Sequence, residues 1–180
     1  MRLFHFSEEP GIAVFVPRSP LKQSERPPGR DWLNGPLVWA IDDAHAFLYL
    51  FPRDCPRILA FATPTTTAED RKVHLGNSRV VAFVELRWLE RISATTLWRY
   101  ELPAESFDDL SDAGMHVSRS TVRPIGVDRV TDLPARFAAE AVDLRYLPDL
   151  TPLRDLWTTS LHVSGIRLRN AAGWSPIGDG

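Results

Sequence analysis

Proline and glycine are the residues that most restrict how this chain can fold. Fifteen prolines and ten glycines are spread over 180 residues. Proline ends or kinks helices, and both residues favour turns, so few windows are long enough for a helix of several turns. Between these breaks, short runs of β-branched and aromatic residues predict about seven or eight short strands, with about three or four short helices.

The order of the predicted elements indicates the fold class. Strand patterns fall at residues 3–6, 37–41, 57–62, 79–85, 96–101, 115–118, 122–130 and 142–147. Helical patterns do not alternate regularly with them, as a doubly wound parallel sheet would require. We therefore expect an α+β fold with a mixed, mainly antiparallel split β-sheet and a few short helices. One domain is expected over residues 1–171, followed by a flexible, glycine-rich C-terminal tail over residues 172–180.

Three other segments carry local predictions. Residues 13–16 are β-branched and aromatic, which predicts a strand that Pro17 ends. Residues 63–77 are polar and rich in threonine, which predicts a loop. Residues 149–160 show a helical pattern, for which Thr151 is the expected N-terminal cap.

Composition excludes several classes of protein. Hydrophobic residues make up 44% of the chain and charged residues 24%, and six Trp, nine Phe and three Tyr supply a globular core. A formal charge of −2 argues against a surface that binds nucleic acid throughout, although a local basic groove for nucleic acid is not excluded. No apolar run is long enough to span a bilayer, and the N-terminal segment does not match a signal peptide. We expect a bacterial-type cytoplasmic protein with no membrane partner.

The single cysteine, Cys55, excludes an internal disulfide and a cysteine-based zinc site. Flanking residues Arg53 and Arg57 would favour a reactive thiolate. The interpretation that we prefer is a small, partly buried residue, because free cysteines usually pack in this way.

Motifs for several kinds of enzyme are missing from the sequence. No two of the five histidines have the i, i+4 spacing of a helical zinc site, so no metal is predicted. The nucleophile elbow Gly-x-Ser-x-Gly and the glycine-rich nucleotide-binding loops are also missing. One tripeptide, His-Val-Ser, occurs twice, at residues 116–118 and 162–164.

The N-terminal strand carries the first candidate binding residues. In the extended segment His5-Phe6-Ser7, the side chains of His5 and Ser7 lie on the same face, where they can jointly bond a sugar hydroxyl or a carboxamide. A terminal strand with one satisfied histidine is the alternative interpretation.

The segment at residues 37–49 carries further candidate binding residues. The strand at residues 37–41 leads directly into Asp42, which is the expected cap of a short helix. Tyr49 lies ten residues beyond Trp39, near the end of this helix. His45 follows the cap and is expected to face solvent.

Together these two segments resemble the ADP-ribosyltransferase superfamily, including the poly(ADP-ribose) polymerases and the small rifampin ADP-ribosyltransferases. In that superfamily, a His-x-Ser or His-x-Thr on the first strand binds NAD, and a later tyrosine stacks on nicotinamide. The resemblance implies that His5 and Ser7, with Phe6 between them, hold the ribose and the carboxamide. It also implies that Tyr49 stacks on the nicotinamide ring and that Trp39 lines the pocket.

The third motif of the superfamily is usually a strand that begins with a glutamate. The matching segment here is residues 116–122, in which Ser120 or Thr121 stands where the acid is expected. Four residues of this segment are expected to bind NAD or its acceptor: His116, Ser118, Arg119 and Ser120. Without the carboxylate, an oxocarbenium-like transition state loses roughly two to three orders of magnitude in rate. Glu101 and Glu105 are the candidates to replace it.

Arginines cluster in two places. Arg53 and Arg57 follow the predicted helix, and Arg167 and Arg169 lie near the C-terminus, on one face if the chain is extended there. Arginine pairs suit a bidentate grip on phosphate, such as the pyrophosphate of NAD. We therefore include Arg53 and Arg167 among the expected cofactor-binding residues, with a solvated basic surface as the alternative.

The whole chain also resembles a group of uncharacterised bacterial proteins. These share the opening Leu-Phe-His-Phe-Ser-Glu, the stretch at residues 49–57 and the segment at residues 164–170. This resemblance covers most of residues 1–171, and it implies no activity.

The sequence is compatible with three functions, which we state as expectations. The first is an enzyme that uses NAD as its substrate, either an ADP-ribosyltransferase with an unknown acceptor or an NAD glycohydrolase. Its expected catalytic residues are His5, Tyr49, His116 and Ser120. The second is a non-catalytic module that binds a nucleotide or a phosphate on the same fold. The third is an interaction protein, whose mark would be a large exposed apolar patch.

Overall fold

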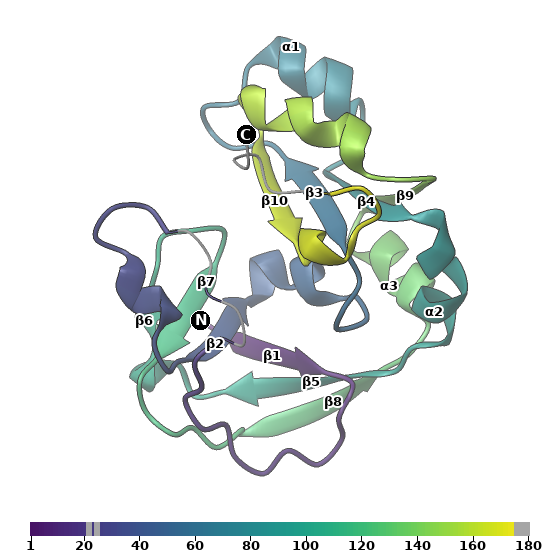
Figure 1. Ribbon diagram of the computed structural model, residues 1–180. Coiled ribbons are helices and arrows are strands. Elements are labelled where there is room, and N and C mark those ends of the chain that lie inside the picture. Colours follow the sequence, from purple (N-terminus) through teal and green to yellow (C-terminus); the bar gives the residue numbers. More distant parts are fainter. Residues whose placement is uncertain (21–22, 24–25, 175–180) are drawn as a thin grey trace. The chain divides into compact units, whose positions relative to one another are not determined.

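The computed structural model describes residues 1–20, 23 and 26–174, and its contacts divide the chain into two compact units. The first unit consists of Met1–Tyr49 and Leu97–Val130, and the second of Leu50–Thr96 and Thr131–Gly180. Each unit contains one mainly antiparallel sheet and several short helices (Figure 1), so the predicted α+β class is confirmed. A single domain over residues 1–171 stays a prediction.

The first unit is built on a six-stranded antiparallel sheet. Its strands are β1 (Leu3–Ser7), β2 (Val38–Asp42), β5 (Leu97–Leu102), β6 (Asp108–Asp109), β7 (Met115–Ser118) and β8 (Gly126–Val130). They lie in the order β6-β7-β2-β1-β5-β8. The described part of this unit also contains the 3₁₀ helices η1 (Asp31–Asn34), η2 (Asp43–Tyr49) and η5 (Ala104–Ser106).

Each face of this sheet packs against its own hydrophobic cluster. Residues paired across neighbouring strands share a face, so the register assigns every side chain to one of two sides. The side that we call the Tyr100 face carries Leu3, Val38, Ala40, Tyr100 and Leu102, which pack with Phe15 and Val122. The opposite side, the Trp39 face, carries Trp39, Met115 and Val117, which pack with Leu33, Leu37 and Leu110.

The segment after β1 covers the Tyr100 face without forming a strand. The Tyr100 hydroxyl donates to the Glu9 carbonyl (2.8 Å) and accepts from the Ile12 N–H (3.1 Å). Phe15 exchanges two backbone hydrogen bonds of 2.8 Å with Val122. The predicted strand at residues 13–16 is therefore wrong, because only Phe15 pairs with another segment there.

The second unit is built on a four-stranded sheet in the order β10-β3-β4-β9. Its strands are β3 (Arg57–Phe61), β4 (Val80–Glu85), β9 (Val142–Leu147) and β10 (His162–Ile166), and only the β4–β9 pair is parallel. The helices are α1 (Ala68–Asp70), η3 (Arg71–Leu75), η4 (Leu86–Trp88), α2 (Leu89–Ala94), α3 (Leu133–Ala139), η6 (Thr151–Thr158) and η7 (Leu168–Asn170).

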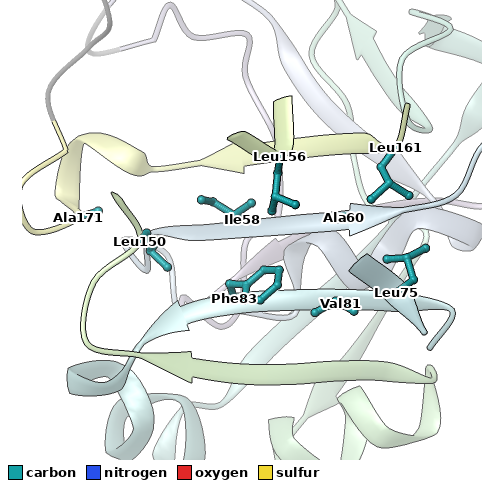
Figure 2. Close-up of a cluster of buried hydrophobic side chains, with 9 residues drawn as sticks. All are labelled: Ile58, Ala60, Leu75, Val81, Phe83, Leu150, Leu156, Leu161 and Ala171. Carbon is teal, nitrogen blue, oxygen red and sulfur yellow. The ribbon is translucent and has the colours of Figure 1, made fainter. Parts of the chain in front are cut away.

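One face of this sheet buries the hydrophobic cluster drawn in Figure 2. The cluster consists of Ile58, Ala60, Leu75, Val81, Phe83, Leu150, Leu156, Leu161 and Ala171. Trp174 also packs against it, although the sequence places this residue in the predicted tail. The remainder of that tail, residues 175–180, lies outside the described residues.

Two local predictions in the second unit are wrong. Residues 63–77 contain α1 and the π-helical turn η3, because the Thr67 hydroxyl caps the Asp70 N–H (3.1 Å) and Leu75 enters the core. Thr151 is the first residue of η6 rather than its cap. The carboxylate of Asp149 accepts from the Thr151 N–H (2.9 Å) instead.

In the part of the chain that the structure describes, we find no helix with the length and apolar character needed to cross a membrane.

Candidate functional site

The candidate site begins where β1 separates from β2. β1 pairs with β5 along its whole length, but it pairs with β2 only at Leu3 and Phe4. Beyond Phe4, the Trp39 carbonyl of β2 lies 2.9 Å from His5 Nδ1. Because a carbonyl oxygen only accepts, Nδ1 of His5 carries the proton, and Nε2 is an acceptor in the neutral ring. The His5 ring also packs on Phe15, with 4.8 Å between the ring centroids.

His5 and Ser7 share the Tyr100 face. The pairs His5↔Tyr100 and Ser7↔Trp98 in the ladder with β5 place them there. The Ser7 hydroxyl accepts from the Glu9 N–H (3.0 Å), which turns the chain directly after β1. Both side chains are half-buried. The strand therefore presents an imidazole and a hydroxyl on one side, two residues apart.

His116 and Ser118 of β7 lie on this same face, because they pair with Ala40 and Val38 of β2. The side chain of His116 is only 2% exposed. Its Nδ1 donates to the Gly114 carbonyl (3.0 Å), so Nε2 of the neutral ring carries no proton. This Nε2 has no hydrogen-bond partner among the described residues, and it lies 3.9 Å from Asp109 Oδ1.

A buried acceptor without a donor is uncommon, and it costs about 1–3 kcal/mol. A hydroxyl or amide donor of a ligand would satisfy His116 Nε2. The neighbouring Ser118 hydroxyl is held differently, because it accepts from the Ser120 N–H (3.1 Å).

Phe6 and Trp39 lie on the opposite side of the sheet, because Phe6 pairs with Arg99 and Trp39 with Val117. The Tyr49 hydroxyl donates to Met115 Sδ (3.3 Å), and Met115 belongs to the Trp39 face. The register therefore divides the expected binding residues of the first unit between two faces. His5, Ser7, His116 and Ser118 share one of them.

Of the two candidate replacements for the missing glutamate, Glu101 does not lie on the Tyr100 face. Glu101 pairs with Phe4 on the Trp39 face, and its carboxylate holds Arg2 in two hydrogen bonds of 2.9 and 2.8 Å. The hydrogen bond from Arg2 lowers the pKa of Glu101. Glu105 is exposed on η5. The register places the carboxylates of Asp42, paired with Leu3, and Asp109, paired with His116, on the Tyr100 face.

Sequence analysis did not identify Asp42 as the hydrogen-bond partner of His45. Asp42 Oδ1 accepts from both the backbone N–H and the ring Nδ1 of His45, each at 2.8 Å. The Gly114 carbonyl accepts from the Asp42 N–H (2.9 Å) and from His116 Nδ1 (3.0 Å). Asp42 and the Gly114 carbonyl therefore link His45 to His116. His45 was expected to face solvent, but only 30% of its side chain is exposed. The Asp-x-x-His spacing, which matches an N-cap and its third helical residue, was the available signal.

The arginines that were expected to bind NAD lie in different units. Arg119 binds the Asp108 carboxylate (2.9 Å) and lies over the Trp32 ring. Arg53 and Arg167 belong to the second unit. The chain is not extended at Arg167, because this residue has φ 57° and precedes the 3₁₀ helix η7. Arg167 and Arg169 therefore do not share the face of a strand.

The segments at residues 49–57 and 164–170 meet in the second unit. Asn170 Nδ2 donates to the Asp54 carbonyl (2.8 Å), and the Asn170 carbonyl accepts from Arg87 (2.7 Å). Arg87 in turn holds Glu85, a carboxylate with no exposed surface. These contacts give Asp54 and Asn170 a role in holding the fold together.

Cys55 is fully buried, which agrees with the interpretation that we preferred. Burial raises the pKa of its thiol to about 12, although Arg57 acts in the opposite direction. The thiolate is therefore scarce at neutral pH, and its fraction grows about tenfold for each pH unit up to that value.

We expect native protein in neutral buffer to resist alkylation of Cys55 by iodoacetamide. The same protein unfolded in urea should react at the rate of a free thiol, whose ordinary pKa is about 8.5. Intact-mass spectrometry over a time course measures both rates. Equal rates in the native and unfolded protein would contradict the burial of this thiol.

Within the described ranges, no group of three or more His, Cys, Asp or Glu side chains is arranged to hold a metal ion.

The chain matches the model of a family of unknown function, DUF6886, over residues 4–171, and it therefore belongs to that family. Neither a curated protein nor a solved structure matches it.

Proposed function

We propose that this protein binds NAD and breaks the bond between nicotinamide and ribose, passing ADP-ribose to a nucleophile or to water. The observation that carries the proposal is the separation of β1 from β2 at His5, whose ring the Trp39 carbonyl holds in one tautomer. A histidine at this position of the first strand, followed by Ser7, is also the feature that resembles the ADP-ribosyltransferase superfamily.

The Tyr100 face supplies two imidazole acceptors with defined tautomers. His5 Nε2 is suited to accept from a ribose hydroxyl, and buried His116 Nε2 to accept from a second donor, such as the nicotinamide amide or the acceptor hydroxyl. The resemblance assigns the nicotinamide ring to Tyr49, whose hydroxyl contacts Met115 of the Trp39 face. The acid of the third motif is the missing component.

Incubation of the purified chain with NAD, followed by chromatography of released nicotinamide, tests this proposal. We expect release from the wild type and a loss of about 100-fold in His5→Ala and in Tyr49→Ala, because each variant removes a group that positions the substrate. His74→Ala, a change in the second unit outside the expected site, is the matched control and should keep the wild-type rate.

A second candidate is a module that binds NAD or a related nucleotide without turnover. Ser120 at the third motif and the position of Glu101 on the opposite face favour it. In that case NAD raises the melting temperature of the wild type, and less so that of His5→Ala, while no nicotinamide appears. If NAD yields no nicotinamide and does not raise the melting temperature, both candidates are refuted.

A further inference from the structure

The second unit contains a serine and a histidine in direct contact on one strand. His162 and Ser164 of β10 are two residues apart and therefore point to the same side, with 2.9 Å between His162 Nε2 and Ser164 Oγ. The imidazole stacks on Phe61 of β3, with 4.6 Å between the ring centroids and 27° between the planes. Both residues are half-buried. The pair thus combines a hydroxyl, a base within hydrogen-bond reach and an aromatic ring that orients the base.

The strand that carries this pair is anchored from its other side. Val163 packs against the cluster of Figure 2. A Cβ on Gly165 would lie 2.9 Å from Trp157 Cζ2, so the missing side chain allows η6 to approach β10 closely. A site on a packed strand keeps its geometry better than one on a loop.

The other copy of the tripeptide, at residues 116–118, has the same three residues but different contacts. His116 Nδ1 bonds to a backbone carbonyl, and its Nε2 has no hydrogen-bond partner. The Ser118 hydroxyl accepts from the Ser120 N–H and is 1% exposed. Residues 116–118 thus have the same sequence as residues 162–164 but lack the contact between hydroxyl and imidazole, so they serve as an internal comparison.

We propose that Ser164 is a nucleophile activated by His162, and that it accepts acyl groups from activated esters. The Ser164 hydroxyl donates to His162 Nε2 when the ring carries its proton on Nδ1. β10 is the edge strand of its sheet, and alternate N–H groups of such a strand point away from the partner strand. Either the Ser164 N–H or those of Val163 and Gly165 thus point away from β3, and these are the donors that the proposal assigns to the developing oxyanion.

The reaction transfers one proton and one acyl group. Ser164 Oγ forms a bond to the ester carbonyl carbon while its proton passes to His162 Nε2. The carbon–oxygen bond to the alcohol then breaks, and the alcohol leaves with that proton. Water, deprotonated by the same nitrogen, releases the acid and restores the serine.

An alkyl fluorophosphonate carrying biotin tests the nucleophile on the full chain. The probe forms a bond from phosphorus to Ser164 Oγ, fluoride leaves, and the proton passes through His162 to the buffer. We expect one adduct per chain, located on Ser164 by peptide mass mapping of the wild type, and p-nitrophenyl acetate should acylate the same residue. Labelling should disappear in Ser164→Ala, and it should stay unchanged in Ser93→Ala, which removes an exposed serine of α2 outside both sites.

The role of His162 is tested separately with His162→Gln, which retains a polar side chain at the site. The rate of labelling should fall by about 100-fold or more, the usual contribution of a positioned base. A thermal melt of each variant shows that the fold is retained. The proposal is wrong if no adduct forms, if the adduct lies on another residue, or if His162→Gln reacts at the wild-type rate. None of these results depends on whether the protein acts on NAD.

Discussion

Replacing Glu85 by alanine is expected to lower the free energy of unfolding by about 2–3 kcal/mol, because it removes the hydrogen bonds that a buried carboxylate accepts from Arg87 and Ala172. The Glu85 side chain has no exposed surface, and its Oε2 accepts from Arg87 at 3.0 Å (Nε) and 2.6 Å. Its Oε1 accepts from the Ala172 N–H (2.6 Å). The substitution therefore removes the carboxylate that connects β4 to the segment after η7, and with it the acceptor that Arg87 and the Ala172 N–H share.

The neighbouring strand β9 provides a matched control. Arg145 binds Asp143 Oδ2 through Nε (3.0 Å) and a terminal nitrogen (2.7 Å), with the same i, i+2 spacing. This carboxylate is 39% exposed, so Asp143→Ala should cost less than about 1 kcal/mol. Urea unfolding of the full chain, followed by fluorescence, measures both variants. Equal losses would show that burial does not decide the strength of these pairs.

The fold was predictable where the local pattern and the tertiary environment agree. The apolar run of β4, from Val80 to Val84, predicts a buried strand, and it lies in the sheet between β3 and β9. Residues 63–77 are polar, but a capping hydroxyl on Thr67 and one buried side chain, Leu75, are sufficient for a helix there. Phe15 pairs with Val122, more than a hundred residues away, and no local pattern at residues 13–16 could reveal that partner.

The candidate site was predictable only within each strand. Period-two alternation places His5 and Ser7 on one face. Which residues of β2 share that face depends on the register between the strands, because a slip of one residue exchanges the two faces. The observed register places Ala40 and Asp42 on the Tyr100 face together with His5, and it places Trp39 on the opposite face. The sequence contains no turn between β1 and β2 that would set this register, since a long segment with its own bridges connects them.

Replacing Gly114 by alanine is expected to lower the free energy of unfolding by about 3 kcal/mol. Gly114 has φ +73°, which costs an L-residue about 1–2 kcal/mol, and a Cβ there would lie 2.5 Å from both Asp42 Oδ1 and His45 Nδ1. The new methyl group must displace the carboxylate that caps η2, and loss of such a cap costs about 0.5–2 kcal/mol. The Asp42–His45 hydrogen bond, and the position of the His45 ring, should be lost with it.

Gly11 separates the backbone contribution from the steric one. It has the same φ of +73°, but a Cβ at this position would meet nothing within 4 Å. Gly11→Ala should therefore show only the backbone contribution of about 1–2 kcal/mol. Urea unfolding compares the two variants, and the ¹⁵N shifts of the His45 ring report whether Asp42 still accepts from Nδ1. If both variants lose the same stability and the His45 ring is unchanged, the close approach of Gly114 to Asp42 is not what requires glycine there.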